Sequence, residues 1–411
     1  MTTQAGPTDV DVRAEQVFFE FLGNPPDVEP YASYRWFHEH APVFRGSNGM
    51  IVLSRFADVD AVLRHRDMGR GEESVQHLTD LPPRLLEPVM RRWKRTMVFA
   101  NPPLHTKMRR KVGAQFLPRH VEAMRELVAR RARETMDALA DSPGADFVTT
   151  VASPLGGAAV ADLLGVPEDD RAELARLSPR SMGVFDPMTA TSDLEAAAAA
   201  EITMADYFAD ALEERRTAPR DDLLTRLVAP ADGDPLEPIE MVAAAANLTN
   251  AGNDTTTNLL SNSMYALLTH PEQLRRLREH PELVPRAVEE LARFDPPLNL
   301  NPRTALVKTT VAGLDLEPGE IVVGIQGAAN RDPRRYTDPD ALDLGRDEGV
   351  SLAFGGGAHF CMGAHLGRLV MSEFLTCLIT RFSGAEPAAT PRRRPGHNLR
   401  GFAELPVRLS R

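Results

Sequence analysis

The stretch "LAFGGGAHFCMGAHLGR", residues Leu352–Arg368, places three consecutive glycines before a cysteine and a fourth glycine just after it. Glycine adopts positive φ freely and lets the backbone approach a flat ligand closely, so this pattern predicts a bent loop pressed against something planar. The residues that follow Cys361 are typical of a helix. A cysteine at such a junction faces backbone N–H groups and the positive end of the helix dipole, which together favour a thiolate.

The chain has only one other cysteine, Cys377. On one helix, sixteen residues would separate the two thiols by about 24 Å, which is far beyond disulfide reach. Cys361 is therefore expected to be a free thiol, a nucleophile or a ligand. The CxxC pair of c-type haem attachment is absent, and a zinc site would need more cysteine or histidine partners nearby. After these two exclusions, the metal site that remains possible is a single Cys361 thiolate that ligates one iron.

The length, composition and net charge are those of an ordinary globular protein. Its 411 residues are 43% hydrophobic and 26% charged, and the net charge of -11 argues against a nucleic-acid-binding surface over the whole molecule. The N-terminal residues are polar without an apolar leader, and no apolar run reaches the length of a membrane span. We expect a cytoplasmic protein with no membrane and no nucleic acid among its partners.

The order of segments predicts a mainly helical fold with small β-sheets. Alternating apolar residues suggest a strand at Gly49–Phe56, whereas most of Val121–Arg293 has helical periodicity. Strand-like pieces return at Thr309–Ile325, around a turn at Pro318 and Gly319, and at Gly401–Leu409. No Gly/Ser-rich linker divides the chain, so we expect one domain over residues 1–411, with about the first 16 residues as a mobile tail.

The cysteine loop resembles a known family. The spacing Phe354-Gly355-x-Gly357-x-His359-x-Cys361-x-Gly363 is similar to the haem-binding loop of the cytochromes P450. The resemblance implies a b-type haem sandwiched between a long distal helix and the helix after the loop. It also implies that Cys361 is the axial ligand, that Phe354 packs near the sulfur and that His359 lies near a propionate. The alternative, a glycine-rich turn with a buried structural cysteine, does not account for so many ordered positions.

The sequence departs from the usual family pattern at three positions. Ser351 stands where His is common, Gly367 where Ala is common, and Val370 where Glu is common. None of these residues is the predicted ligand.

A second motif, "NLTNAGNDTTTNLL" at Asn247–Leu260, lies in a predicted helix from about residue 236 to 269. Ala251, Gly252 and Thr255 share one face of it, and Gly252 leaves a gap there at a cost of about 1 kcal/mol in helix propensity. The motif resembles the family's oxygen-binding helix. That resemblance implies that O₂ binds at Ala251 and Gly252, and that Asp254 and Thr255 deliver protons. Taken alone, Thr255 could equally be a helical threonine bonded to a backbone carbonyl.

Two further motifs fit the same family. "EELARFDPP" contains Glu290 and Arg293, neighbours on a helix surface, and the resemblance implies a buried structural ion pair that braces the cysteine loop. "NPPLHTKMRRKVGAQF", residues 101–116, carries His105 and Arg109 on one helical face. The resemblance implies that these two residues, with Arg303 and His359, bind the haem propionates through charge-assisted hydrogen bonds.

Lys107, Arg110 and Lys111 are expected to cluster on the opposite face of that helix. Most such clusters are simply solvated. The resemblance nevertheless implies a docking surface for an electron donor, and an acidic ferredoxin would suit a local basic patch. We therefore expect a monomer that receives electrons from NAD(P)H through a separate ferredoxin and ferredoxin reductase.

The substrate residues are mapped from the same resemblance. They form a mostly apolar wall that carries two amide side chains, of the kind that orients a hydrophobic molecule with few hydrogen bonds. The alternative for either amide is that it points away and caps local backbone. The set is Asn247, Leu248, Leu298, Asn299, Leu300 and Phe402.

The resemblance implies a haem-thiolate monooxygenase that uses O₂ to hydroxylate or epoxidise a mostly apolar natural product. Two alternatives belong to other classes. The first is a cofactor-free enzyme with Cys361 as nucleophile and His359 or His365 as base. The second is a non-catalytic relative that assists another biosynthetic enzyme, although such a protein would be expected to lose Cys361, Asp254 or Thr255, all of which are present.

Overall fold

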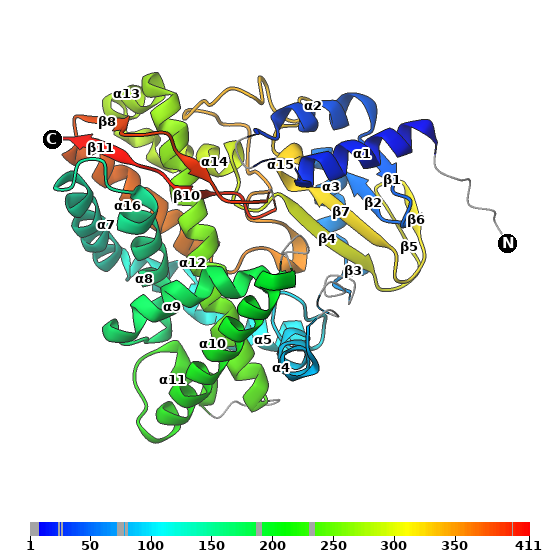
Figure 1. Cartoon of the computed structure of the whole chain (residues 1–411), viewed down its shortest axis with the longest axis horizontal. Helices are drawn as coiled ribbons and strands as arrows, with labels where there is room; N and C mark the ends of the chain where they lie inside the picture. Colours follow the sequence, from blue (N-terminus) through cyan, green and yellow to red (C-terminus); the bar gives the residue numbers. More distant parts are fainter. Residues whose placement is uncertain are drawn as a thin grey trace. The chain divides into compact units, whose positions relative to one another are not determined.

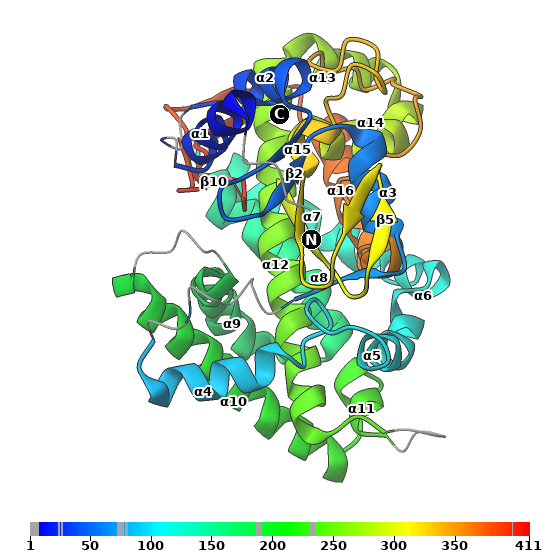
Figure 2. The same ribbon diagram turned by 90° about the vertical axis from the view of Figure 1, so that its right-hand side faces the viewer.

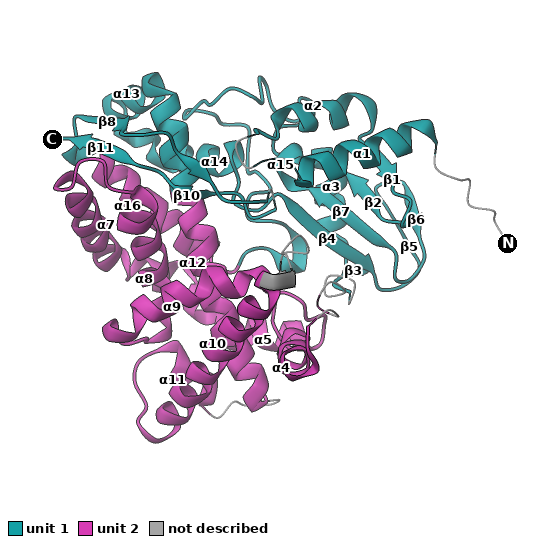
Figure 3. Ribbon diagram, viewed as in Figure 1, with its two compact units in different colours: residues 1–71, 261–361, 379–411 teal, residues 72–260, 362–378 magenta. Residues whose placement is uncertain are grey.

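The computed structural model describes residues 8–23, 25, 28–71, 78, 81–185, 191–229, 235–396 and 398–411. The chain divides into two compact units (Figure 3). Unit 1 contains residues 1–71, 261–361 and 379–411, and unit 2 contains residues 72–260 and 362–378. Two of the four divisions fall inside helices, α12 (Pro238–Thr269) and α16 (Ala364–Arg381), and the other two follow Gly71 and Cys361.

Unit 1 is built on a five-stranded sheet in the order β1-β2-β7-β4-β3 (Figure 1). Its strands are β1 (Val43–Arg45), β2 (Ile51–Leu53), β3 (Met68–Gly69), β4 (Leu300–Ala305) and β7 (Ile321–Ile325). The β2–β7 pair is parallel, and the other three pairs of this sheet are antiparallel. Three small two-stranded sheets pair β5 (Thr309–Val311) with β6 (Leu314–Leu316), β8 (Gly384–Pro387) with β11 (Val407–Ser410), and β9 (Arg392–Arg393) with β10 (Phe402–Glu404).

Alternate residues of the central strands β2 and β7 pack into two different apolar cores. Val52 and Val323 pack on one face of the sheet with phenylalanines of the helices α1 (Asp9–Gly23) and α2 (Tyr31–His40). Leu53 and Val322, which are adjacent to them in sequence, pack on the other face with residues of helix α3 (Phe56–Arg64). Adjacent strand residues point to opposite faces, so one sheet serves both cores.

The helices of unit 1 cover this sheet and extend from it. They are α1 (Asp9–Gly23), α2 (Tyr31–His40), α3 (Phe56–Arg64), α13 (Pro271–Glu279), α14 (Val284–Phe294) and α15 (Gln326–Ala329).

Unit 2 is helical throughout its described residues, and Figure 2 shows α4 beside α10. Its helices, besides most of α12 and α16, are α4 (Pro83–Trp93), α5 (Leu104–Gly113), α6 (Pro118–Glu122), α7 (Arg125–Ala140), α8 (Ser153–Leu164), α9 (Glu168–Ser181), α10 (Thr191–Thr217) and α11 (Leu223–Val228). A π-helical turn at Val148–Ala152 leads into α8. Helix α8 ends at Gly165, whose φ of 84° is the left-handed conformation that glycine adopts without strain.

The mainly helical fold with small sheets is confirmed. Helix α12 spans Pro238–Thr269, close to the predicted range, and Pro271 begins the next helix. The predicted strand at Gly49–Phe56 is shorter, because Phe56 already begins α3.

The structure differs from the expected N-terminal tail, because residues 9–16 belong to helix α1. Ala14, Val17, Phe18 and Phe21 recur at helical spacing and are buried, and this apolar stripe anchors the helix on unit 1. Within the described ranges, no single helix has the length and apolarity of a membrane span. Only the bent pair Val148–Leu164 and Glu168–Val184, turned by 120°, meets those criteria.

Candidate active site

The loop before Cys361 is shaped by two glycines with positive φ. Gly355 has a φ of 70° and Gly357 a φ of 65°. A Cβ atom at Gly357 would lie 2.1 Å from the carbonyl oxygen of Leu63, at the end of α3. The prediction attributed these glycines to a planar ligand. The structure gives Gly357 a different reason, since its backbone must approach α3 more closely than a side chain permits.

Cys361 closes this loop and is exposed. Its backbone N–H donates to the Phe354 carbonyl at 2.9 Å, which folds the segment back on itself. His359 and Phe354 are half-buried, and His359 ends a short 3₁₀ turn. Helix α16 begins three residues after the cysteine, at Ala364, as predicted, and Gly363 lies between them with no neighbour within 4 Å of a Cβ position. The thiol is thus carried on a tightly bonded loop with access for a ligand.

The Glu290–Arg293 pair is buried in unit 1. The Arg293 Nε donates to Glu290 Oε2 at 2.6 Å, and the two side chains are 2% and 1% exposed. Arg346 adds a second cation, with its Nε 3.1 Å from both oxygens of Glu290. Arg346 was not predicted from the sequence, because it lies on a distant loop that returns to α14.

Arg293 also ties this ion network to the cysteine loop. One of its nitrogens donates to the carbonyl oxygens of Asn330 and Pro339, each at 2.8 Å. The side chain of Asn330 in turn accepts a hydrogen bond from the Leu352 N–H at 2.7 Å. Leu352 is the first residue of the loop stretch, so the pair reaches the loop through one intermediate residue.

On α12 of unit 2, the Thr255 hydroxyl donates to the Ala251 carbonyl at 2.5 Å. This is the local bond that the sequence analysis kept as an alternative. Ala251 is exposed and Thr255 is half-buried, whereas Asp254 is 1% exposed. A proton-delivery role for Thr255 therefore requires its hydroxyl to leave the Ala251 carbonyl.

Gly252 has a packing role that the sequence did not reveal. A Cβ at this position would lie 2.2 Å from Val160 Cγ2 on α8. The Cβ side of Gly252 therefore faces Val160, and binding of O₂ beside Gly252 stays a prediction. Gly156 and Gly157, also on α8, come similarly close to Thr256 and Asn253. Small residues on both helices let α8 and α12 approach closely.

This contact predicts a change of sign in a double-mutant experiment. Gly252→Ala should destabilise the wild-type chain by about 1–3 kcal/mol through overpacking. Val160→Ala removes Cγ1 and Cγ2 and leaves the Cβ at 3.2 Å, so in that background most of the clash is relieved and the same change should stabilise by up to about 1 kcal/mol through helix propensity. Urea unfolding of the four proteins measures both values, and an equal effect of Gly252→Ala in the two backgrounds would contradict the contact.

Helix α5 presents His105 and Arg109 as predicted on one helix, with His105 3% exposed and Arg109 half-buried. The cations on its other face are not a free surface patch. Lys107 lies 3.0 Å from Glu240 at the start of α12. Lys111 donates to the Ala229 carbonyl at 2.9 Å, and burial lowers its pKa.

Two of the three cations expected to dock a donor are therefore engaged within unit 2. Arg110, on the same helix, is exposed.

Arg303 lies on β4 in unit 1 and is 1% exposed. Its Nη1 donates to Asn301 Oδ1 at 2.5 Å and to the Pro302 carbonyl at 2.9 Å, while its Nε has no hydrogen-bond partner. Burial, with the nearby Arg70 cation, lowers the pKa of Arg303 well below its ordinary value. A buried guanidinium with only neutral partners fits a site that receives an anion.

The predicted substrate residues divide into two groups, of which the first belongs to the core of unit 1. Asn299 is fully buried, and its side-chain oxygen accepts from the Tyr34 hydroxyl at 2.9 Å. Phe402 is 2% exposed and packs between the ring of Tyr265, at 4.8 Å, and the guanidinium of Arg393, at 3.9 Å. Both side chains thus already have partners within the unit, and their contact with a substrate stays a prediction.

Leu298 and Leu300 are half-buried, and Leu300 packs on the phenylalanine core of unit 1. The second group, Asn247 and Leu248, lies on α12 in unit 2, at 7% and 8% exposure. The side chain of Asn247 makes no hydrogen bond with another described residue. Asn247 is thus the amide of the predicted pair that stays available for a ligand.

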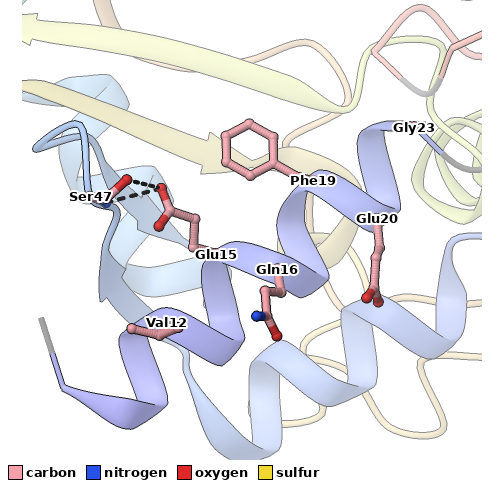
Figure 4. Close-up of a pocket in the computed structure, with 7 residues that line it drawn as sticks. All are labelled: Val12, Glu15, Gln16, Phe19, Glu20, Gly23 and Ser47. Atoms are coloured by element: carbon pink, nitrogen blue, oxygen red, sulfur yellow. Dashed lines mark hydrogen bonds between the residues drawn. The ribbon is translucent and has the colours of Figure 1, made fainter.

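A shallow hollow of about 790 Å³ lies along α1 in unit 1, and its lining includes none of the predicted site residues (Figure 4). Ser47 and Glu15 line one end of it, where the N–H and the hydroxyl of Ser47 both donate to Glu15, at 3.0 and 2.9 Å. The remaining lining residues are Val12, Gln16, Phe19, Glu20 and Gly23. This hollow offers no group suited to the predicted chemistry.

The family model described as "Cytochrome P450" matches residues 177–409. The chain belongs to the cytochrome P450 family. It is 32% identical over 408 residues to the "Steroid C26-monooxygenase" of Rhodococcus jostii (strain RHA1), covering 97% of this chain and 83% of that relative. It is 34% identical over 402 residues to the "Nocardicin C N-oxygenase" of Nocardia uniformis subsp. tsuyamanensis, covering 94% of this chain and 97% of that one.

Solved P450 structures share the fold over nearly the whole chain. P450BioI, crystallised with an acyl carrier protein that bears hexadec-9Z-enoic acid, has a TM-score of 0.85 at 29% identity, covering 93% of this chain and 99% of that one. CalO2 has a TM-score of 0.84 at 31% identity and covers 99% of both chains. This P450 is an oxidoreductase of the monooxygenase class, and family membership implies the use of haem, O₂ and an electron donor.

Proposed function

We propose that this P450 uses a b-type haem and O₂ to hydroxylate or epoxidise a mostly apolar small molecule in natural-product biosynthesis. The observation that carries the proposal is the exposed Cys361 at the end of a loop braced by the buried Glu290–Arg293 network. A thiolate is a strong anionic ligand for iron, and a rigid loop holds it in one position. The whole chain, residues 1–411, is proposed to act as one domain.

Haem would be held by the Cys361 thiolate as ligand of its iron, with Phe354, Gly355 and Gly363 contributed by the same loop. The anionic propionates would be held by His105, Arg109, Arg303 and His359. The buried Arg303 supports this assignment, because it has only neutral hydrogen-bond partners. When bound, the haem iron supplies the binding and reductive activation of O₂, whose chemistry belongs to the cofactor.

The chain's own part in the reaction is to hold and move protons beside Ala251, where O₂ is proposed to bind. The Thr255 hydroxyl has one proton, which it now donates to the Ala251 carbonyl. When that bond opens, the hydroxyl would be free to donate its proton beside Ala251. Asp254, directly before it, is proposed to return a proton from solvent.

Thr255→Ala should leave haem content unchanged but divert electrons from product to hydrogen peroxide, because the Oγ1 proton is lost. We expect the ratio of product to NAD(P)H consumed to fall about ten-fold or more, the scale of a lost general acid. Thr255→Ser is the matched control, since it keeps the hydroxyl and should stay near the wild-type ratio. An unchanged ratio in the alanine variant would refute the proton role.

The substrate is proposed to be a neutral, mid-sized, mostly apolar natural product that bears oxygen, such as a polyketide or terpenoid. Leu248 offers an apolar contact and Asn247 one amide for a substrate oxygen. Asn247, Ala251 and Thr255 stand at successive turns of α12, so a substrate held by Asn247 would face the oxygen site. The relatives include one named for a steroid and one named for nocardicin C, and both names fit molecules of this size.

Spectral titration of the ferric protein tests this assignment. Neutral oxygen-bearing scaffolds should displace the iron-bound water and shift the spin state, whereas small carboxylates should not. Asn247→Leu should weaken binding of a responding scaffold about ten-fold, because one buried hydrogen bond is lost. A spin shift with carboxylates alone would overturn the substrate class, and equal affinity in the leucine variant would remove Asn247 from the site.

Electrons are proposed to come from NAD(P)H through a separate ferredoxin and ferredoxin reductase, and the protein is proposed to act as a cytoplasmic monomer. With Lys107 and Lys111 engaged by Glu240 and Ala229, α5 offers Arg110 as its exposed cation. The alternative function is a non-catalytic P450-like partner of a biosynthetic enzyme. Product formation with surrogate redox proteins distinguishes the two, because the non-catalytic partner would form none.

A further inference from the structure

Two amide side chains of unit 2 border the exposed turn of α12. Residues 243–250 of this helix are all buried, and Ala251 is the first exposed residue after them. Asn247 stands one turn before Ala251 on the same face, and Asn250 directly precedes it. Asn250 was not among the residues predicted from the sequence. Both amides therefore lie beside the place where O₂ is proposed to bind.

Asn250 is held in one orientation by helix α9. The Ser181 hydroxyl donates to Asn250 Oδ1 at 3.0 Å, and the two residues are 0% and 3% exposed. The same hydroxyl lies 2.9 Å from the Ser178 carbonyl oxygen, so its one proton is shared between two acceptors. Because the oxygen end of the amide is directed at Ser181, its Nδ2 end points elsewhere.

The Nδ2 group of Asn250 is a hydrogen-bond donor without a protein acceptor. It bonds to no other residue of the part of the chain that the structure describes, yet this atom is not fully closed off from solvent. A polar group in an otherwise buried position needs a partner, and a water molecule can serve when the site holds no ligand. A substrate that displaces this water must bring an acceptor of its own.

We propose that Asn250 is a specificity-determining residue whose Nδ2 donates to a carbonyl oxygen of the substrate, and that Ser181 is its positioning residue. The inference rests on the proposed function and deepens it, because it names the functional group that the substrate carries. A carbonyl oxygen accepts and cannot donate, which matches an amide that offers only its N–H end. Only the hydrogen bond between α9 and α12 singles Asn250 out, so the sequence gave no sign of it.

The test uses two probes that differ only in a carbonyl group, cyclopentadecanone and cyclopentadecane. Spin-state titration of the ferric holoprotein gives a dissociation constant for each probe. In Asn250→Leu, which keeps the side-chain size and removes the donor, ketone binding should weaken about ten-fold, the scale of one buried hydrogen bond. Hydrocarbon binding should not weaken, so the ratio of the two constants moves toward the hydrocarbon.

Two serine variants separate positioning from packing. Ser181→Ala leaves the Asn250 amide free to rotate, so the ratio should move in the same direction by about three-fold, as for a weaker neutral hydrogen bond. Ser178→Ala is the matched control, since Ser178 is also 0% exposed on α9 but its hydroxyl has no hydrogen-bond partner among the described residues. Its ratio should equal that of the wild type.

An unchanged ratio in Asn250→Leu would overturn the proposal, and so would equal weakening of both probes, which indicates only a packing role. A change in Ser178→Ala as large as that in Ser181→Ala would overturn the positioning role of Ser181. If the leucine variant does not fold, the ratio in Ser181→Ala decides by the same criterion. A wild-type protein whose spin state responds to neither probe would refute the proposed substrate class and, with it, this site.

Discussion

Replacing Cys361 with serine is expected to remove the long-wavelength Soret band of the reduced CO complex and to abolish oxygenation of the substrate. A serine hydroxyl stays protonated near neutral pH and binds iron weakly, whereas a thiolate is a soft anionic ligand. Absorbance of the reduced CO complex measures the first effect, and product formation measures the second. This is the largest change in activity expected from a single substitution in this chain.

Cys377→Ser is the matched control for that experiment. Cys377 is the chain's second cysteine, 5% exposed on α16, and neither cysteine forms a disulfide. Its serine variant should keep the long-wavelength band. Survival of the band in Cys361→Ser would show that another group ligates the iron, and loss of the band in both variants would point to a general disturbance of the fold.

Replacing Arg293 with methionine is expected to give the largest loss of stability. Glu290 would remain 1% exposed with only Arg346 as its cation, and the Asn330 and Pro339 carbonyls would lose their donor. Breaking a buried ion pair by removing one partner typically costs about 3–5 kcal/mol. Urea unfolding should show a loss of this size, and haem content should fall because the network reaches the cysteine loop.

Arg408→Met is the control, because Arg408 pairs with Glu386 at the surface, where the side chains are 52% and 60% exposed. An exposed pair of this kind contributes about 1 kcal/mol or less. Arg293→Lys, which keeps the charge but loses the planar fork, should lie between the two. Equal free energies of unfolding for the Arg293 and Arg408 methionine variants would show that the buried network does not brace the fold.

Much of the fold could be predicted because its signals are local. The apolar periodicity of α12 and the helix after Cys361 depend on residues within a few turns, and both helices were found where the sequence placed them. Helix α1 was not predicted, because its first residues are polar and acidic, although its buried apolar residues recur at helical spacing.

The structural roles of individual residues were harder to predict. Gly252 and Gly357 look like openings for a ligand, yet each lets one segment approach another, α8 in the first case and α3 in the second. Asn299 and Phe402 have the chemistry of pocket residues but are already bonded or packed within unit 1. Sequence shows which side chain a position carries, and only packing shows what that side chain touches.

The sequence by itself determined the family, the thiolate ligand proposed at Cys361 and the order of the motifs, because short spacings along a loop or helix fix which residues share a turn. The tertiary structure decided which charges are paired. Lys107 pairs with Glu240, Lys111 donates to the Ala229 carbonyl, and Arg346 joins Glu290 from a distant loop. Electrostatic energy depends on distance and burial in space, and neither quantity can be read from separation along the sequence.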